Sequence, residues 1–244
     1  MKGVMLGIDA RAVIVDITHS LEPGDIRGAA FALAAACNCF PAGTVHVAVV
    51  DPGVGGPRKA IAVKTDNYTF VAPDNGVLSI ALAREKVRAI HLLENEKLFR
   101  APVSRTFHGR DVFGPVAARL SAGRSIQTVG RPQLSYIRLP WPKPRRGRDG
   151  IAGEIAYVDR FGNAITNIGE GWIGKGRGGQ VLFGRSRSCA VQPYYQAAER
   201  GDVVGVIGSS GYLEIAVNGG SAARQFGLRT GDPVRFLPPR KPRR

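Results

Sequence analysis

The feature that most restricts the fold of this chain is a change of sequence pattern near residue 140. Before it, short β-branched runs at residues 12–17, 45–50, 60–65 and 68–73 alternate with helix-like stretches at residues 25–40, about 77–85 and about 110–122. After "LPWPKPRRGRDG" (residues 139–150), apolar runs are separated by Gly-rich turns, and residues 197–200 are the only helix-like stretch. Alternating strands and helices are typical of a parallel α/β layer, whereas many short strands are typical of a small barrel or sandwich.

We therefore predict an α/β protein with two domains. Residues 1–140 form a sandwich-like α/β domain with a mainly parallel sheet, residues 141–150 are a linker, and residues 151–240 form a small β-barrel. Asp25 is placed to cap the helix that follows it. With 244 residues, 44% of them hydrophobic, the chain is long enough for two modest cores.

The net charge of +15 raises the question of a nucleic-acid partner. The basic residues cluster in "KPRRGR" (residues 143–148) and "PPRKPRR" (residues 238–244), which are Pro-rich and lack interleaved aromatic residues for base stacking. A linker and a terminal tail explain both clusters, so a basic protein that associates with nucleic acid is kept only as a third interpretation.

No apolar run approaches the roughly 20 residues that a membrane span requires, and no charged-then-apolar signal sequence opens the chain. Three cysteines, Cys37, Cys39 and Cys189, form no CxxC pair. We interpret them as reduced, buried residues of a cytoplasmic protein, and we expect neither a metal site nor a membrane partner.

Chemistry is first suggested by the loop "VVDPGVGGPR" (residues 49–58). It matches neither the phosphate-binding GxxxxGK[ST] pattern nor the dinucleotide pattern GxGxxG. Asp51 follows a strand at its carboxyl end, the edge at which open α/β sheets bind ligands. Arg58 lies seven positions further on, so the loop can fold back and pair the two side chains. That pair is either a structural salt bridge or part of a site.

A histidine in "TFHGRD" is the second candidate. His108 is flanked by loop-type residues, whereas His46 and His91 lie in strand-like runs and are expected to pack, and His19 is a minor candidate. A carboxylate, an arginine and a histidine at one sheet edge can position and polarise a water molecule. Either His108 or Asp51 would accept its proton.

Two stretches of the second domain carry polar groups around turns. In "YVDRFGNAITNI", Asp159 and Asn163 flank a Phe-Gly turn, and they either cap that turn or hold an amino group or an adenine edge with Phe161 stacking. In "GSSGYLEIAVNGGSAA", Ser209 and Ser210 precede a strand. Before the predicted helix 77–85, "APDNG" is interpreted as a turn.

Six stretches together resemble the S-adenosylmethionine (SAM) hydroxide adenosyltransferases, which are adenosine-forming SAM hydrolases related to the fluorinases and chlorinases. The stretches are "VDITHSLEPGDIRGAAFAL", "VHVAVVDPGVGGPRKAIAV", "FVAPDNGVL", "RTFHGRDVFGPVAARL", "YVDRFGNAITNI" and "SSGYLEIAVNGGSAA". They occur in the order of the family and cover nearly the whole chain. The resemblance implies an α/β domain followed by a β-barrel, assembled as a homotrimer with sites between subunits.

The resemblance also implies a reaction: water or hydroxide attacks C5′ of the ribose of SAM and releases adenosine and methionine. SAM is then the substrate, and no cofactor is expected. Asp51, Arg58 and His108 would activate the water, with Arg58 orienting Asp51 and favouring a developing hydroxide. A sulfonium leaving group is already cationic, so the site has to supply an aligned nucleophile rather than a general acid.

Substrate contacts are implied in the second domain. Asp159 would face the methionine ammonium group, and Asn163 the adenine. Ser209 and Ser210 would lie by the methionine carboxylate, and the adjoining wall would comprise Tyr212, Glu214, Val217 and Gly219. The halogenating relatives carry a hydroxyl side chain where Asp51 stands, and often one where Gly109 stands. Both positions here favour water over halide.

One departure from the family concerns its opening strand, which ends in a Thr-Asp-Phe-Gly motif whose Asp grips the ribose hydroxyls. This chain begins with "MKGVMLGID", which is typical of a helix and has no strand before it. Either the start codon is assigned too late, or the chain is a truncated paralogue that binds SAM or adenosine with impaired catalysis; a simply short first helix is the remaining alternative. We expect little activity and low stability, both restored by an upstream extension.

Overall fold

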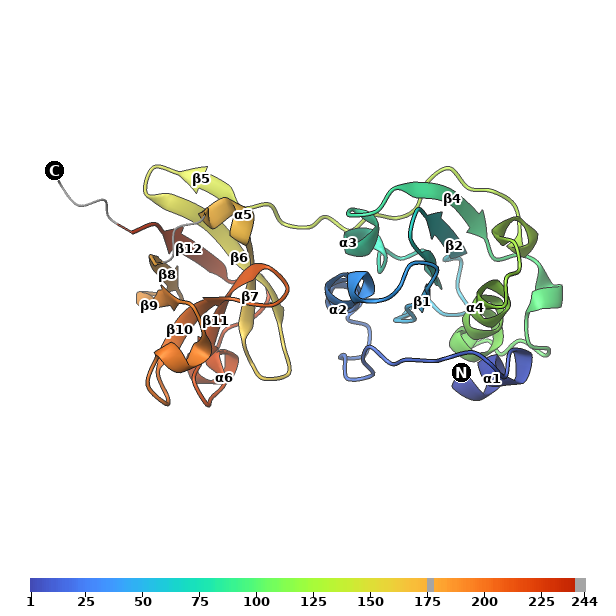
Figure 1. Ribbon diagram of the computed structural model, residues 1–244, viewed down its shortest axis with the longest axis horizontal. Helices are drawn as coiled ribbons and strands as arrows, with labels where there is room; N and C mark the ends of the chain where they lie inside the picture. The colour runs from blue at the N-terminus through green and yellow to red at the C-terminus, as the bar shows by residue number, and fades with distance from the viewer. Residues whose placement is uncertain (175–177, 240–244) are drawn as a thin grey trace. The chain divides into compact units, whose positions relative to one another are not determined.

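The protein is described by a computed structural model that covers residues 1–174 and 178–239. The chain divides into two compact units, Met1–Pro140 and Trp141–Arg244, which are described separately. Figure 1 labels most of the helices and strands of both.

The first unit contains four strands and several short helices. Its elements are α1 (Lys2–Ile8), α2 (Ile26–Ala36), η1 (Cys37–Cys39), β1 (Val45–Val47), β2 (Ala60–Thr65), β3 (Thr69–Pro73), α3 (Ser79–Leu82), β4 (Val87–Leu92), η2 (Glu96–Leu98), the π-helical turn η3 (Gly109–Phe113), α4 (Gly114–Ser121) and η4 (Ile126–Val129).

The four strands lie in the order β1-β3-β2-β4. Only β1 and β3 are parallel, whereas β2 is antiparallel to both β3 and β4. The mixture of helices and strands confirms the α/β class. The expected mainly parallel sheet is wrong for these strands, since two of their three pairs are antiparallel. The reason is the short connection: only residues 66–68 join β2 to β3, and a parallel pair needs a crossover of a dozen or more residues.

Helix α2 forms where the sequence predicts it. The Asp25 carboxylate accepts the backbone N–H of Gly28 at 2.8 Å, which caps the first turn. Its buried face includes Phe31 and Leu33. Strand β3 is buried at every position, so it forms the centre of this unit's core.

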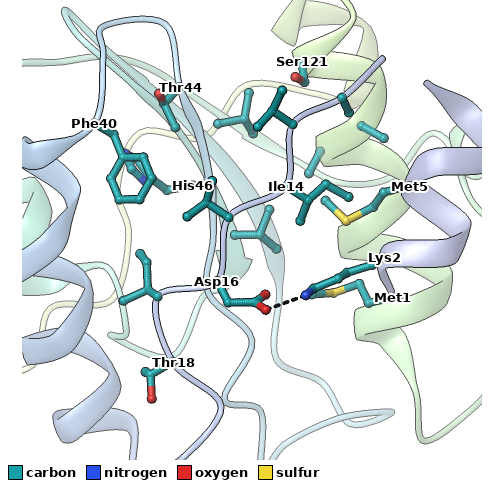
Figure 2. Close-up of a pocket in the computed structure, with 18 of the residues that line it drawn as sticks. Met1, Lys2, Met5, Ile14, Asp16, Thr18, Phe40, Thr44, His46 and Ser121 are labelled. Carbon is teal, nitrogen blue, oxygen red and sulfur yellow. Dashed lines mark hydrogen bonds and ion pairs between the residues drawn. The ribbon is translucent and has the colours of Figure 1, made fainter. Parts of the chain in front are cut away.

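The strand predicted at residues 12–17 is wrong. This segment pairs with no described strand, and Val13 and Val15 are 89% and 59% exposed. Between it and the edge strand β1 lies a largely apolar groove of about 540 Å³. In Figure 2, Ile14 and Asp16 lie on the segment, and Asp16 pairs with Lys2 of α1. Alternating β-branched residues favour an extended backbone, but a strand also needs a neighbour for its backbone groups.

The second unit is the predicted small β-barrel. Its elements are β5 (Arg145–Gly147), β6 (Gly150–Val158), β7 (Ala164–Gly169), α5 (Glu170–Ile173), β8 (Gln180–Phe183), β9 (Arg187–Gln192), η5 (Tyr195–Ala197), β10 (Val203–Ile207), β11 (Tyr212–Val217), α6 (Ala222–Phe226) and β12 (Pro233–Leu237). The strand order is β12-β8-β9-β10-β11-β7-β6, and pairing of β12 with β6 closes it. All neighbours are antiparallel except β9 and β10.

Three smaller expectations need correction. Residues 141–150, expected as a linker, contain β5, which pairs with β6 and so belongs to the barrel unit. The predicted helix at 197–200 is not formed: the turn η5 ends at Ala197, and residues 198–200 are not helical. Cys37 and Cys189 are buried and free as expected, but Cys39 is exposed.

Among residues 1–174 and 178–239, we find no helix with the length and apolar character needed to cross a membrane.

Candidate functional site

The loop that follows β1 carries Asp51 and is held at both ends. Just before Asp51, the carbonyl of Val50 accepts a hydrogen bond of 2.8 Å from the side-chain amide of Asn75. Further along, Gly55 has φ +76°, and a Cβ atom there would lie 2.4 Å from the carbonyl oxygen of Arg105. Glycine is thus required at position 55, because the backbone turns left-handed and a second loop approaches it closely.

Arg58 closes this loop onto Asp51. Its Nε lies 2.9 Å from Oδ1 and 3.0 Å from Oδ2, and its Nη2 also donates to Oδ2. The two side chains are only 13% and 6% exposed. The guanidinium carbon stands 5.3 Å from the ring centre of Phe113. Such a forked, mostly desolvated pair fixes the direction of the carboxylate.

His108 completes the group from a distant part of the chain. Its Nδ1 lies 2.8 Å from Nη2 of Arg58. Because a guanidinium only donates, Nδ1 must accept this hydrogen bond, and the ring proton sits on Nε2. Burial, reinforced by the charge of Arg58, lowers the pKa of His108 below its ordinary value and so favours this neutral form.

The structure thus brings together the three residues that the sequence predicts as a water-activating set. A cavity of about 360 Å³ reaches Arg58 and His108, and its wall also contains Glu94 and Phe99. That volume holds several water molecules. The arrangement can therefore orient a carboxylate, hold an imidazole N–H and admit water.

The other histidines lie elsewhere. His19 contacts Asp16 at 3.0 Å on the surface. His46 is buried among aromatic rings, and His91 is buried and donates from Nδ1 to the carbonyl of Gly130 at 2.9 Å. None of the three joins the group around Arg58.

In the second unit, the turn between β6 and β7 is built by Asp159 and Asn163. The Asp159 carboxylate accepts the backbone N–H of Asn163 at 2.8 Å and its side-chain amide at 3.0 Å. The capping alternative is therefore realised in this structure. Phe161 at the tip is 79% exposed, so its ring is available for contact with another molecule.

The turn between β10 and β11 contains Ser209 and Ser210. The Ser210 hydroxyl is buried and has no hydrogen-bond partner among the described residues. Buried hydroxyls nearly always have a partner, so an orphan one is a place where a ligand atom can bind.

Glu214 lies close to this turn, since a Cβ on Gly208 would overlap its carboxylate. It is 5% exposed, and it accepts a hydrogen bond of 2.9 Å from the hydroxyl of Tyr195. Burial, followed by this contact with Glu214, raises the pKa of Tyr195 to about 12. Burial also raises the pKa of Glu214, and the charge of Asp159 adds to that. Sequence reasoning missed Tyr195, because it comes from η5 and only the fold brings it to β11.

The remaining predicted wall residues differ in placement. The Tyr212 ring lies 6.2 Å from that of Trp141. Val217 points into the barrel core and is 5% exposed. Its backbone rather than its side chain is therefore what this position could offer a ligand. Gly219 adopts φ +73° in a turn beside Arg200.

In the described part of the chain, no group of three or more His, Cys, Asp or Glu side chains could hold a metal ion.

Comparison with known families matches both units. Residues 1–130 match the N-terminal domain of the SAM hydroxide adenosyltransferases, and residues 153–235 match the C-terminal domain. The chain belongs to the SAM hydroxide adenosyltransferase family. The resemblance seen in the sequence motifs is confirmed.

Relatives in this family carry two kinds of name. An (R)-S-adenosyl-L-methionine hydrolase from Thermus thermophilus is 40% identical, and the match covers 97% of this chain and 92% of that protein. One of the same name from Salinispora tropica is also 40% identical, with coverage of 96% and 89%. A fluorinase from Actinoplanes is 28% identical, with coverage of 94% and 89%.

Solved structures show the same fold. The crystal structure of an uncharacterised conserved protein from Thermotoga maritima is 40% identical and superimposes with a TM-score of 0.91, covering 97% of this chain and 93% of that one. A conserved hypothetical protein from Thermus thermophilus is 37% identical with a TM-score of 0.80, and the coverage is again 97% and 93%.

Proposed function

We propose that this protein hydrolyses S-adenosyl-L-methionine to adenosine and L-methionine. The observation that carries the proposal is the contact of Arg58 with both Asp51 and His108, in a family whose relatives at 40% identity are named (R)-S-adenosyl-L-methionine hydrolases. From those names we infer that the preferred substrate has the R configuration at the sulfonium sulfur.

The geometry supports a specific division of labour. Water attacks C5′ of the ribose, the new C5′–O bond forms as the C5′–S bond breaks, and sulfur leaves with the bonding electrons as a neutral thioether. Because Nδ1 of His108 already accepts from Arg58, the Nε2–H donates to the water oxygen and cannot take its proton. Asp51 takes that proton, using the lone pair that three hydrogen bonds from Arg58 leave free.

The second unit supplies groups suited to the amino-acid end of the substrate. Asp159 and Glu214 provide carboxyl groups for the ammonium group, whose positive charge would offset the burial that raises the pKa of Glu214. The buried Ser210 hydroxyl can donate to the carboxylate. The exposed Phe161 offers a stacking surface for adenine. We further propose a homotrimer in which these groups complete the Asp51 group of a neighbouring subunit.

Turnover is tested with SAM that is a mixture of both sulfonium epimers. Chromatography should show adenosine and methionine in equal amounts, with loss of the R epimer, and Asp51→Asn should release at least about a hundredfold less adenosine. Added fluoride or chloride should leave adenosine as the nucleoside product. A 5′-halogenated nucleoside, or undiminished turnover by Asp51→Asn, would contradict the proposal.

The shared site has its own test. Asp51→Asn and Asp159→Asn should each be inactive, and mixing them under conditions that exchange subunits should restore part of the activity. The reason is that one variant then supplies an intact first unit and the other an intact second unit. A monomeric mass by light scattering, or mixtures that stay inactive, would rule out the shared site.

The three free cysteines fit a reducing compartment, and we propose that the protein works in the cytoplasm.

A further inference from the structure

We propose that Asp111 is a positioning residue, which holds the loop bearing His108 against the loop bearing Asp51. The inference rests on the proposed function, because it gives Asp111 importance through His108. Asp111 itself is fully buried, so it acts through its neighbours and does not touch the substrate.

The Asp111 carboxylate has an unusually complete set of partners. It accepts a forked pair of hydrogen bonds from Arg110, at 2.8 and 2.9 Å. The backbone N–H of Ser104 donates to it at 2.9 Å, and Arg100 lies 3.3 Å away. These contacts, with the hydrogen bond from Arg110 the largest cause, hold the pKa of Asp111 well below its usual range.

These contacts fix the main chain on both sides of His108. The bond from Ser104 to the Asp111 side chain closes a loop that contains His108. Next to His108, the carbonyl of Phe107 accepts the backbone N–H groups of Arg110 and Asp111, each at 3.2 Å, and these bonds begin the turn η3. With both ends tied, the backbone at His108 has little freedom to shift.

The same loop contacts the loop of Asp51 directly. Arg105 follows Ser104, and its carbonyl oxygen would lie 2.4 Å from a Cβ atom on Gly55. On the other side of His108, a Cβ atom on Gly109 would lie 3.4 Å from Cγ1 of Val49. A shift of Ser104 would therefore change the spacing between the loops that carry His108 and Asp51.

Stability alone gives a poor reason for this carboxylate. Arg100 and Arg110 are 46% and 35% exposed, whereas Asp111 is completely buried. Burying a charge costs desolvation, and well-packed apolar residues often serve stability as well or better. Unlike an apolar side chain, a carboxylate provides a side-chain acceptor with a fixed direction for a backbone N–H, here that of Ser104.

The test compares Asp111→Asn with two controls. The asparagine keeps the volume but places an NH₂ group where one of the donors now binds. Ser104→Ala keeps the backbone N–H that donates to Asp111 and removes the hydroxyl, which accepts the backbone N–H of Thr106 at 3.2 Å, so it tests whether any lost contact in this loop has the same effect. Thr65→Val removes a different buried contact, the 2.9 Å bond from the Tyr68 N–H, at the far end of β2 from Arg58.

For Asp111→Asn we expect kcat for adenosine release to fall about tenfold to a hundredfold, with KM within about threefold. The ¹⁵N spectrum of the His108 ring should show loss of the hydrogen bond from Arg58 to Nδ1. Both controls should keep kcat within about twofold, and thermal unfolding confirms that each variant is folded. The inference is overturned if Asp111→Asn keeps its kcat, or if its His108 resonances match the wild type.

The two proposals fail in different ways. If the wild-type protein releases no adenosine, the proposed function is wrong, and the His108 spectrum of Asp111→Asn still decides the positioning role. If the wild type is active while the spectrum of Asp111→Asn is unchanged, only the positioning role is wrong.

Discussion

Replacing Arg58 with lysine separates the charge of this residue from its shape. In the structure, Nε and Nη2 together make three hydrogen bonds to the Asp51 carboxylate and one to Nδ1 of His108. A lysine ammonium keeps the positive charge, but it is a single point on a flexible stem and cannot fork across the carboxylate while also reaching the imidazole.

The size of the effect is set by the hydrogen bonds that a lysine cannot make. Hydrogen bonds that involve a charged group contribute about 1.5–3 kcal/mol each, and Arg58 and Asp51 are only 13% and 6% exposed, so water replaces little of that stabilisation. If Arg58→Lys gives up about 3 kcal/mol of transition-state stabilisation, kcat falls about 150-fold, at 1.36 kcal/mol for each factor of ten.

The assay is adenosine release at saturating SAM, measured by chromatography. Arg88→Lys is the matched control, because Arg88 pairs with Asp66 on the surface, where such pairs contribute about 0–1 kcal/mol. We expect the control to keep its kcat. An Arg58→Lys protein with a kcat within about threefold of the wild type would refute the idea that the fork orients Asp51 and His108.

Four further outcomes are expected from individual contacts in the structure. Because burial and the adjacent guanidinium lower the pKa of His108, a pH–rate profile should stay flat down to its ordinary value of 6.5 and fall only at lower pH. Burial also lowers the pKa of His46, so below pH 6.5 the unfolded state binds more protons than the folded state. The free energy of unfolding, measured with denaturant, should therefore decrease as the pH falls below 6.5, and His46→Phe should make this decrease smaller. Gly55→Ala should lower both the melting temperature and kcat, because the left-handed backbone costs alanine about 1–2 kcal/mol and the new Cβ would clash with the carbonyl oxygen of Arg105. An unchanged melting temperature and an unchanged kcat would contradict the close approach of the two loops. Ser210→Ala should raise KM with no loss of melting temperature, since within the described part of the chain the hydroxyl has no hydrogen bond for the substitution to break; an unchanged KM would argue against its contact with substrate.

Much of the barrel could be predicted from the sequence. Its apolar runs are short and separated by glycines, and each run became a strand because local chain conformation and the following turn are set by nearby residues. The same holds for α2, where Asp25 caps the helix through a partner three residues away. The segment at 12–17 shows the limit of this reasoning, since its pattern is strand-like but no described strand pairs with it.

The sequence by itself determined which residue types were present for the chemistry, and it placed Asp51 and Arg58 in one loop, where seven positions of separation let them pair. Tertiary structure alone decided that His108, fifty positions beyond Arg58, would meet that guanidinium and therefore carry its proton on Nε2. It also decided the strand directions of the first sheet and the pairing of Tyr195 with Glu214. The physical reason is range: turns and caps depend on neighbours along the chain, whereas burial, tautomer and pKa depend on groups that only folding brings together.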